Sequence, residues 1–295
     1  MDTFDELLRK RPEISPENLN KDLEKYYRPY AKELIDLKKE KKSSHGLVVG
    51  ICAIQGAGKT TQGEIMESLL RSLGYSSISL SIDDYYITHK ELSELREKDP
   101  RYMRRGVTHD IPLAVKNLAD LKSMEAGAKI KVPVYDKGVE NGDGDRIGWK
   151  TISDKPDFIL FDGWMLGARR VEDESIFESG LPALETKEHV QFAKDINKKL
   201  DEYLPLWGLI DFMNVLYVPN YQISLAWRDQ AEEILRAKGE GMTHEQIVEF
   251  VHYFWRSVHP AIQIKNLAYD KIHTQQVVVI NDDHSIKEVL IPGKL

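Results

Sequence analysis

Apolar and polar positions divide the chain into short continuous apolar runs and longer segments with helical spacing. The first apolar run, Leu47–Ile54, has the length and composition of a buried strand. Further strands are predicted at Ser77–Ile82, Asp157–Phe161 and Phe212–Val218, and Lys129–Val134 is a candidate for a short strand. Because helical segments separate these runs, the pattern predicts an α/β fold with a mostly parallel sheet covered on both faces.

Several segments between the predicted strands have the periodicity of helices. Pro112–Met124 has this spacing and is followed by a glycine stop signal at Gly127. Tyr221–Ala237 is a second predicted helix, and a third begins at the capping box of Thr243 and Gln246. The residues that this third helix is expected to bury are Ile247, Val251, Phe254 and Val258.

The two ends of the chain predict different structures. Residues 17–42 are rich in lysine and glutamate with apolar residues at helical spacing, and Pro29 should kink or split the resulting helix. We expect residues 1–44 to form an N-terminal helical extension and 45–295 to form one domain. The apolar positions of the extension are Leu19, Leu23, Tyr26, Tyr27, Tyr30, Leu34 and Leu37.

Turn-forming residues mark two further segments. Tyr135–Gly148 is rich in glycine and acidic residues, which is typical of a loop, and long loops beside α/β sites often clamp substrates. Near the C-terminus, Gln275–Ile280 and Ile286–Ile291 flank a turn at Asn281-Asp282-Asp283, which predicts a β-hairpin.

Composition excludes several classes of protein. The net charge of −7 argues against a general nucleic-acid binder, and no apolar run approaches the ~20 residues that span a bilayer. The N-terminus lacks the apolar core of a signal peptide, and the single cysteine, Cys52, excludes an intrachain disulfide framework. We therefore expect a cytoplasmic protein whose partner is a small molecule, while its oligomeric state stays open.

The turn after the first apolar run has the pattern of a phosphate-binding loop. In Gln55-Gly56-Ala57-Gly58-Lys59-Thr60-Thr61 the glycines let backbone N–H groups surround phosphate oxygens, and the following helix adds the positive end of its dipole. Lys59 can reach the β- and γ-phosphates, and the Thr60 hydroxyl can ligate Mg²⁺. The pattern G-x-x-x-x-G-K-[ST] fails only at its first position, Ala53. The alternative is an ordinary glycine-rich turn with an incidental lysine.

Carboxylates follow two of the predicted strands. Asp83 and Asp84 come directly after Ser77–Ile82, where a parallel sheet should place them beside the phosphate loop. One of them could accept the proton of a substrate hydroxyl as it attacks the γ-phosphate; alternatively, one caps a turn and the other is solvated. Asp162 follows another apolar run in the Walker-B arrangement, which holds Mg²⁺ directly or through water. Trp164 next to it is expected in the pocket wall or the core.

Basic residues suggest where an anionic substrate would be held. Arg104 and Arg105 are placed to bind a carboxylate or phosphate, or they form a solvated basic turn. His109 either orients a substrate hydroxyl or caps the helix that starts near Pro112. In the long loop, Arg146 is the cation that we favour for the substrate.

Arg228 lies early in the predicted helix Tyr221–Ala237. A lid arginine in such a position neutralises charge on the transferred phosphoryl group. The alternative is an intrahelical ion pair with Glu232, four residues on.

Taken together, these motifs resemble the D-glycerate 3-kinase family of plant and cyanobacterial type with its fungal ATP-binding relatives. More broadly, the chain is similar to the phosphoribulokinase, uridine kinase and pantothenate kinase group of P-loop kinases. The combination of RG-x-x-HD, YDK…G-x-GDR and GWMLG is specific to the glycerate kinase-like branch, whereas the phosphate loop alone is not. The motifs run in family order over about residues 47–260: QGAGKTT (55–61), SIDDYYITH (81–89), RGVTHDIPL (105–113), KVPVYDKGVENGDGDR (131–146), FILFDGWMLG (158–167), WRDQAE (227–232) and GMTHEQIVEFV (241–251).

The resemblance implies a three-layer P-loop NTPase fold with a helical lid, and an ATP- and Mg²⁺-dependent phosphotransferase acting on D-glycerate. It implies that Asp83 is the general base, that Lys59 and Thr60 serve the phosphate loop, that Asp162 is the Walker-B acid and that Arg228 is the lid arginine. Related branches usually carry Glu where this chain has Asp162. The residues that we expect to face the substrate are Asp84, Tyr86, Arg105, His109, Asp110, Tyr135, Lys137 and Arg146.

Two other functions stay open at this point. The same chemistry could act on another hydroxylated metabolite, such as a nucleoside, a pantothenate-like alcohol or a sugar acid; an acid needs cations in its pocket, whereas a nucleoside does not. The chain could also be an ATP-binding switch without a small substrate. Such a switch would not require Asp83 or the long loop Tyr135–Arg146.

Overall fold

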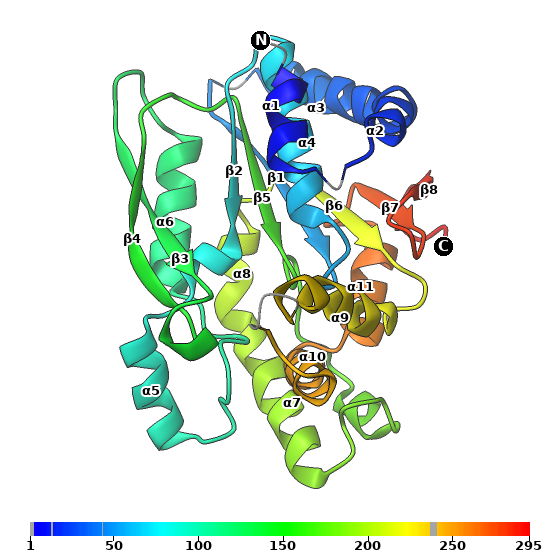
Figure 1. Cartoon of the computed structure of the whole chain (residues 1–295). Coiled ribbons are helices and arrows are strands. Elements are labelled where there is room, and N and C mark those ends of the chain that lie inside the picture. Colours follow the sequence, from blue (N-terminus) through cyan, green and yellow to red (C-terminus); the bar gives the residue numbers. More distant parts are fainter. Residues whose placement is uncertain (1–2, 13, 43, 237–240) are drawn as a thin grey trace.

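A computed structural model describes residues 3–12, 14–42, 44–236 and 241–295, and a six-stranded sheet forms its centre (Figure 1). The strand order is β2-β5-β1-β6-β7-β8, and all neighbours are parallel except β7 and β8. The predicted C-terminal hairpin is therefore confirmed. The strands of this sheet are β1 (Leu47–Ala53), β2 (Ser77–Ser81), β5 (Phe158–Gly163), β6 (Phe212–Tyr217), β7 (Gln276–Ile280) and β8 (Ile286–Leu290).

Helices cover both faces of this sheet and produce the predicted three layers. Successive residues of a strand point to opposite faces of the sheet. What lies next to Gly50 and next to Ile51, which are consecutive in β1, therefore shows what covers each face. A Cβ atom on Gly63 of α4 (Lys59–Ser72) would lie 3.8 Å from Ile51, so α4 lies on that face. A Cβ atom on Gly50 would meet Met213, on the face of β6 against which α11 (Pro260–Tyr269) packs. The three-layer α/β fold is thus confirmed.

A second, two-stranded sheet stands apart from the first, and it corrects one prediction. The strands β3 (Ile130–Asp136) and β4 (Asp145–Ile152) pair antiparallel where a loop had been expected over Tyr135–Gly148 (Figure 1). Their side chains are mostly half-buried or exposed, so no clear apolar alternation marks them in the sequence. Only the residues between them, at the tip of this ribbon, form the expected loop.

The N-terminal helices share the core of the rest of the chain. The helices α1 (Thr3–Lys10) and α3 (Arg28–Glu40) pack on α4, and α2 (Pro16–Asp22) continues into a π-helical turn over Leu23–Tyr27. That turn ends at Tyr27, two residues before Pro29, so the hydrogen-bonding pattern changes next to the residue that lacks an N–H donor. Tyr27 and Arg28 keep right-handed helical backbone angles, so the chain stays helical here and the predicted kink or split stays a prediction. The boundary at residue 44 stays a prediction.

The remaining helices lie beside the sheet and around the carboxyl ends of its strands (Figure 1). Those predicted near Pro112, Tyr221 and Thr243 are present, the last with both hydrogen bonds of its capping box. The predicted end of the second, Ala237, lies outside the described residues. Among the described helices, none is both long and apolar enough to cross a membrane. These helices are α5 (His89–Lys98), α6 (Ile111–Lys122), α7 (Lys187–Lys199), α8 (Leu204–Trp207), α9 (Ile223–Arg236) and α10 (His244–Ser257).

Candidate active site

The predicted phosphate loop joins the end of β1 to the start of α4. Gly56 and Gly58 both have left-handed backbone conformations, with φ of 85° and 84°. Gly58 caps α4 without a side-chain hydrogen bond, so backbone N–H groups at this helix terminus are available to an anion. A side chain on Gly56 would lie 2.9 Å from Cβ of Trp227, so this position tolerates only glycine.

A cavity of about 600 Å³ opens in front of this loop. Its walls come from the phosphate loop, the turn after β2, the tip of the β3–β4 ribbon, and the helices α9 and α10. This volume suits a small-molecule site. Of the site residues proposed from the sequence, those lining the cavity are Gln55, Gly56, Lys59, Asp83, Tyr86, Arg104, Arg105, Lys137, Trp164 and Arg228.

Asp83 supplies a carboxylate to the cavity. It follows β2 in a short 3-10 turn, where the Ser81 hydroxyl accepts a hydrogen bond from its backbone N–H. The Lys137 ammonium donates to one carboxylate oxygen at 2.5 Å, and the other oxygen is buried without a hydrogen-bond partner among the described residues. Burial disfavours the charged form, but Lys137 and Lys59 outweigh it and lower the pKa of Asp83 to about 2. The carboxylate is therefore ionised at neutral pH.

Asp162 is the next-to-last residue of β5, the strand between β1 and β2. The strand β5 thus separates β2 from the phosphate loop, where the sequence had predicted the end of β2 directly beside it. Asp162 is 4% exposed, and the Ser81 hydroxyl donates to it at 3.2 Å. Burial raises the pKa of Asp162 to about 6, with Lys59 opposing the shift. A divalent cation would stabilise this buried anion, so the residue fits a magnesium site.

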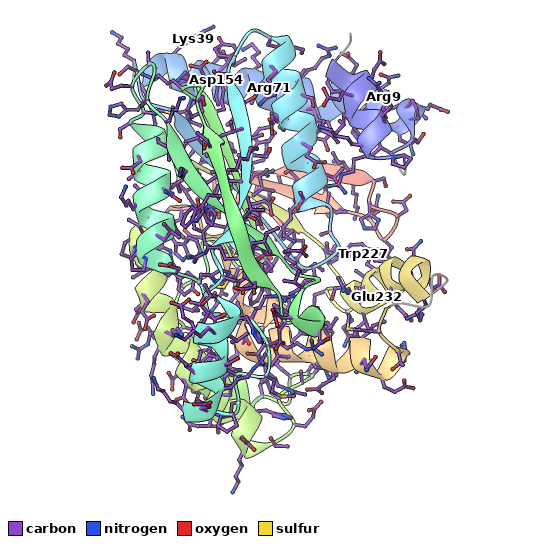
Figure 2. The ribbon with its side chains drawn as sticks, turned by 60° about the vertical axis from the view of Figure 1, so that its left-hand side comes forward. Arg9, Lys39, Arg71, Asp154, Trp227 and Glu232 are labelled. Atoms are coloured by element: carbon purple, nitrogen blue, oxygen red, sulfur yellow. The ribbon has the colours of Figure 1, made fainter. Side chains whose placement is uncertain are left out.

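The helix α9 forms the lid side of the cavity. Trp227 and Glu232, which line the cavity, lie on this helix near mid-height in Figure 2, while Arg71 and Lys39 lie at the top of the molecule in that view. The Arg228 guanidinium pairs with the buried Glu232 carboxylate and lies 5.0 Å from the centre of the Phe250 ring. The ion pair considered from the sequence is therefore present, and the same arginine also lines the cavity.

His109 lies behind the cavity wall rather than in it. It is buried, stacks on Tyr86 at 4.2 Å between ring centres, and shares a 2.8 Å hydrogen bond between Nδ1 and the Tyr203 hydroxyl. Burial lowers the pKa of His109 to about 3, so the ring is neutral. The alternative that His109 caps α6 is wrong, because the Asp110 carboxylate accepts the capping hydrogen bond from Leu113.

Other predicted substrate contacts are engaged within the protein and do not line the cavity. Arg146, the cation favoured for the substrate, forms an ion pair with Asp110 at 3.2 Å and donates to the Tyr86 carbonyl. Asp84 accepts a hydrogen bond from the backbone N–H of Tyr135. These contacts therefore join the β3–β4 ribbon to the rest of the protein.

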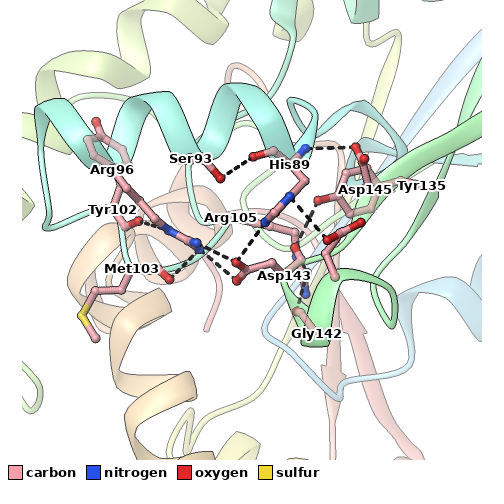
Figure 3. A network of polar contacts seen from close by, with 11 residues as sticks. His89, Ser93, Arg96, Tyr102, Met103, Arg105, Tyr135, Gly142, Asp143 and Asp145 are labelled. Atoms are coloured by element: carbon pink, nitrogen blue, oxygen red, sulfur yellow. Dashed lines mark hydrogen bonds and ion pairs between the residues drawn. The ribbon is translucent and has the colours of Figure 1, made fainter.

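The tip of the ribbon is held by a polar network that the sequence did not reveal (Figure 3). Arg96 binds both oxygens of the Asp143 carboxylate, at 2.6 and 2.9 Å. Arg105 donates to the backbone carbonyls of Gly142 and Asp143, and its guanidinium lies over the rings of Tyr86 and Tyr135. Arg105 thus both lines the cavity and anchors the loop that closes one side of it.

Several cavity residues were not predicted from the sequence. Aromatic rings make up much of this set, and the helical periodicity that marks them is equally that of core positions. His284, in the turn between β7 and β8, contacts the phosphate loop through Nε2 and the Gly56 carbonyl at 2.8 Å, and nothing in its sequence context indicates this. The cavity-lining residues in question include Asn141, Trp227, Gln246, Phe250 and Phe254.

Comparison with known proteins places this geometry in a family. A search against models of known protein families found no match. The chain is 33% identical to the chloroplastic D-glycerate 3-kinase of Arabidopsis thaliana over 216 residues, which cover 70% of this chain and 45% of that protein. It is 30% identical over 226 residues to a protein of Saccharomyces cerevisiae named a probable ATP-dependent kinase, TDA10, with 69% of this chain and 73% of that protein covered. The chain belongs to this family of P-loop kinases.

A solved structure agrees with this membership at the level of the fold. A D-glycerate 3-kinase from Cryptococcus neoformans superposes with a TM-score of 0.79 at 24% sequence identity, and the match covers 90% of this chain and 99% of that one. The chain spans less than half the length of the plant relative.

Proposed function

We propose that the protein is an ATP-dependent kinase that transfers the γ-phosphate to a hydroxyl group of a small hydroxy acid, D-glycerate being the acceptor that we favour. One observation carries this proposal: the Asp83 carboxylate faces the same cavity as Lys59 of the phosphate loop. A proton acceptor beside a phosphate site is what phosphoryl transfer to an alcohol needs and what simple ATP binding does not.

In this proposal, different residues of the cavity bind the nucleotide, accept the proton and neutralise charge. The triphosphate would lie on the N–H groups of 56–61, with Lys59 at its β- and γ-phosphates. The acceptor hydroxyl would point at Asp83, which takes its proton as the oxygen attacks phosphorus in line. Arg228, at the start of the lid, would face the charge that spreads over the transferred group.

Mg²⁺ would be held by the Thr60 hydroxyl and the Asp162 carboxylate together with phosphate oxygens. When bound, it neutralises negative charge on the phosphates. Among the described residues, no three His, Cys, Asp or Glu side chains gather to form a metal cage of their own. This arrangement suits Mg²⁺, which usually binds one or two carboxylates plus the nucleotide.

D-glycerate is favoured over a neutral acceptor because of the charge of the cavity wall. Arg104, Arg105 and Lys137 line it in addition to Lys59 of the phosphate loop, and these extra cations favour an acid over a nucleoside. The two relatives named as D-glycerate 3-kinases lend further support. We further propose a reducing compartment, the cytoplasm, because the single cysteine, Cys52, is buried and unpaired in β1.

The test is ADP release with Mg²⁺ and ATP across a panel of acceptors: D-glycerate, L-glycerate, uridine, pantothenate, ribulose 5-phosphate and several sugar acids. We expect stimulation by D-glycerate alone. Stimulation by another member would keep the kinase and replace its substrate. Slow hydrolysis that no acceptor changes would support an ATP-binding switch instead.

A further inference from the structure

The cations that line the cavity differ in whether an anionic group already holds them. Lys137 is paired with the Asp83 carboxylate, and Arg228 with that of Glu232. Arg105 donates to two backbone carbonyls at the tip of the β3–β4 ribbon. Each of these three therefore has part of its hydrogen-bonding capacity occupied before any ligand binds. Among the described residues, the full set of lining cations is Lys59, Arg104, Arg105, Lys137 and Arg228.

Arg104 differs from these three cations in the contacts of its side chain. No carboxylate of the described part of the chain forms an ion pair with it, and its guanidinium lies 5.1 Å from the centre of the Phe250 ring. Burial lowers the pKa of Arg104, and the more distant Asp143 and Glu249 oppose only part of that shift. A partly buried cation without an anion costs stability, so the site is poised for one from a ligand.

The position of Arg104 separates it from the phosphate site. It lines both the 600 Å³ cavity and a neighbouring cavity of about 360 Å³, which also includes Asn141, Met103 and Tyr253. No residue of the phosphate loop lines this neighbouring cavity. Arg104 therefore lies on the side of the site that leads away from the nucleotide.

The backbone around Arg104 is held in place. The Tyr253 hydroxyl donates to the Arg104 carbonyl at 2.9 Å, and Arg96 donates to the carbonyls of Tyr102 and Met103 at 3.0 and 2.9 Å (Figure 3). Gly106, with φ of 49°, packs against the Tyr253 ring so closely that a Cβ atom would lie 2.9 Å from it. A charged group on such a fixed segment is preorganised for a ligand.

We propose that Arg104 binds the carboxylate of the acceptor and so selects hydroxy acids over neutral alcohols. This inference rests on the proposed function, because it names the side chain that reads the acid group of that substrate. The planar guanidinium can bind a carboxylate through two parallel hydrogen bonds, which gives both charge and orientation. Arg105 and Arg146 do not fill this role, because their donors serve the ribbon and Asp110.

The test compares Arg104→Met and Arg104→Lys with the wild type, and Arg28→Met serves as an exposed control in the N-terminal extension. We expect Arg104→Met to raise the KM for D-glycerate by about 10- to 100-fold, the usual effect of losing a charge-assisted pair. The KM for ATP should stay within about twofold, because ATP binding does not involve the carboxylate of the acceptor. Arg104→Lys should recover part of the loss, and Arg28→Met should match the wild type. A rise in the KM for ATP as large as that for D-glycerate, or an unchanged KM for both, would overturn the assignment.

A binding measurement separates this inference from the proposed function. Calorimetry with Mg²⁺ and a non-hydrolysable ATP analogue should show D-glycerate binding to the wild type and not to Arg104→Met. If the wild type neither binds nor phosphorylates D-glycerate, the proposed substrate is wrong. In that case, lactate, malonate and gluconate are titrated in the same way. A carboxylate that binds the wild type and loses affinity in Arg104→Met supports the role of Arg104, and failure of all of them to bind overturns it.

Discussion

The Lys137 ammonium lies 2.5 Å from the Asp83 carboxylate, so the β3–β4 ribbon delivers a cation to the acid at the end of β2. These residues are 54 positions apart in the chain. The contact joins the ribbon to the chemical centre of the site. It keeps Asp83 ionised, while the second oxygen of this carboxylate is buried without a partner among the described residues.

Replacing Lys137 with methionine should shift the acidic limb of the pH–rate profile to higher pH. Lys137 and Lys59 lower the pKa of Asp83 to about 2, so loss of one of them raises that pKa toward its ordinary value. The rate of the variant should therefore begin to fall at a higher pH than that of the wild type as the solution is acidified. The measurement is kcat/KM from pH 8 down to the lowest pH at which both proteins remain folded. An acidic limb that stays in place would show that Lys137 does not control the charge of Asp83.

The hydroxyl group of Tyr26 should contribute more to the free energy of unfolding than the hydroxyl group of its neighbour Tyr27. The Tyr26 hydroxyl accepts hydrogen bonds from Gln62 and Asn214, at 2.8 and 3.0 Å, and donates to Gln276. Tyr26→Phe leaves these buried amides without that partner, which should lower the free energy of unfolding by about 1–3 kcal/mol.

The control for this prediction is Tyr27→Phe. The Tyr27 ring is also buried, 4.8 Å from that of Tyr26, but it takes no part in the Tyr26 network. Urea unfolding of both variants measures the difference. Equal losses would mean that the network does not tie the N-terminal extension to α4 and the sheet.

His109 should make the fold sensitive to mild acid. Burial lowers its folded-state pKa to about 3, while an unfolded chain has an ordinary value near 6.5. Above about pH 6.5 both states are neutral and no stability is lost. Below it the unfolded state gains a proton that the folded state excludes, so stability falls with pH by up to about 1.4 kcal/mol per unit until the folded pKa is reached.

His109→Gln removes this titration, so its stability should depend less steeply on pH between 6.5 and 4. The comparison uses the slope of stability against pH, because the substitution also disturbs the stack on Tyr86 and shifts absolute stability. His259, whose pKa burial lowers to about 4, remains in both proteins and contributes equally. Parallel slopes for the variant and the wild type would contradict the neutral, buried state of His109.

The sequence predicted those elements whose structure depends on residues close together in the chain. The apolar run before Gly56, the capping box at Thr243 and the turn at Asn281 each report a feature encoded within a few residues. The helix α5 was missed although Thr88 and Glu91 form a capping box at its start. That signal was available in the sequence.

The parts that could not be predicted depend on contacts between distant segments. The strands β3 and β4 carry little apolar alternation and are paired largely with each other, so their sequence reads as a loop. The candidate site shows the same limit, since the sequence offers both Arg104 and Arg146 as cations for the substrate and does not distinguish them. Only the fold shows that Arg146 is held by Asp110, while Arg104 has no such partner among the described residues.

The most direct measurement is the rate of D-glycerate-dependent ADP release by Asp83→Asn, taken together with its affinity for ATP. Asparagine keeps the shape of the side chain and removes the base. Turnover should fall by about 10²–10⁴, the usual contribution of a general base, while ATP still binds through the loop at 56–61. Unchanged turnover in a variant that binds ATP normally would contradict the role of Asp83 and with it the proposed transfer.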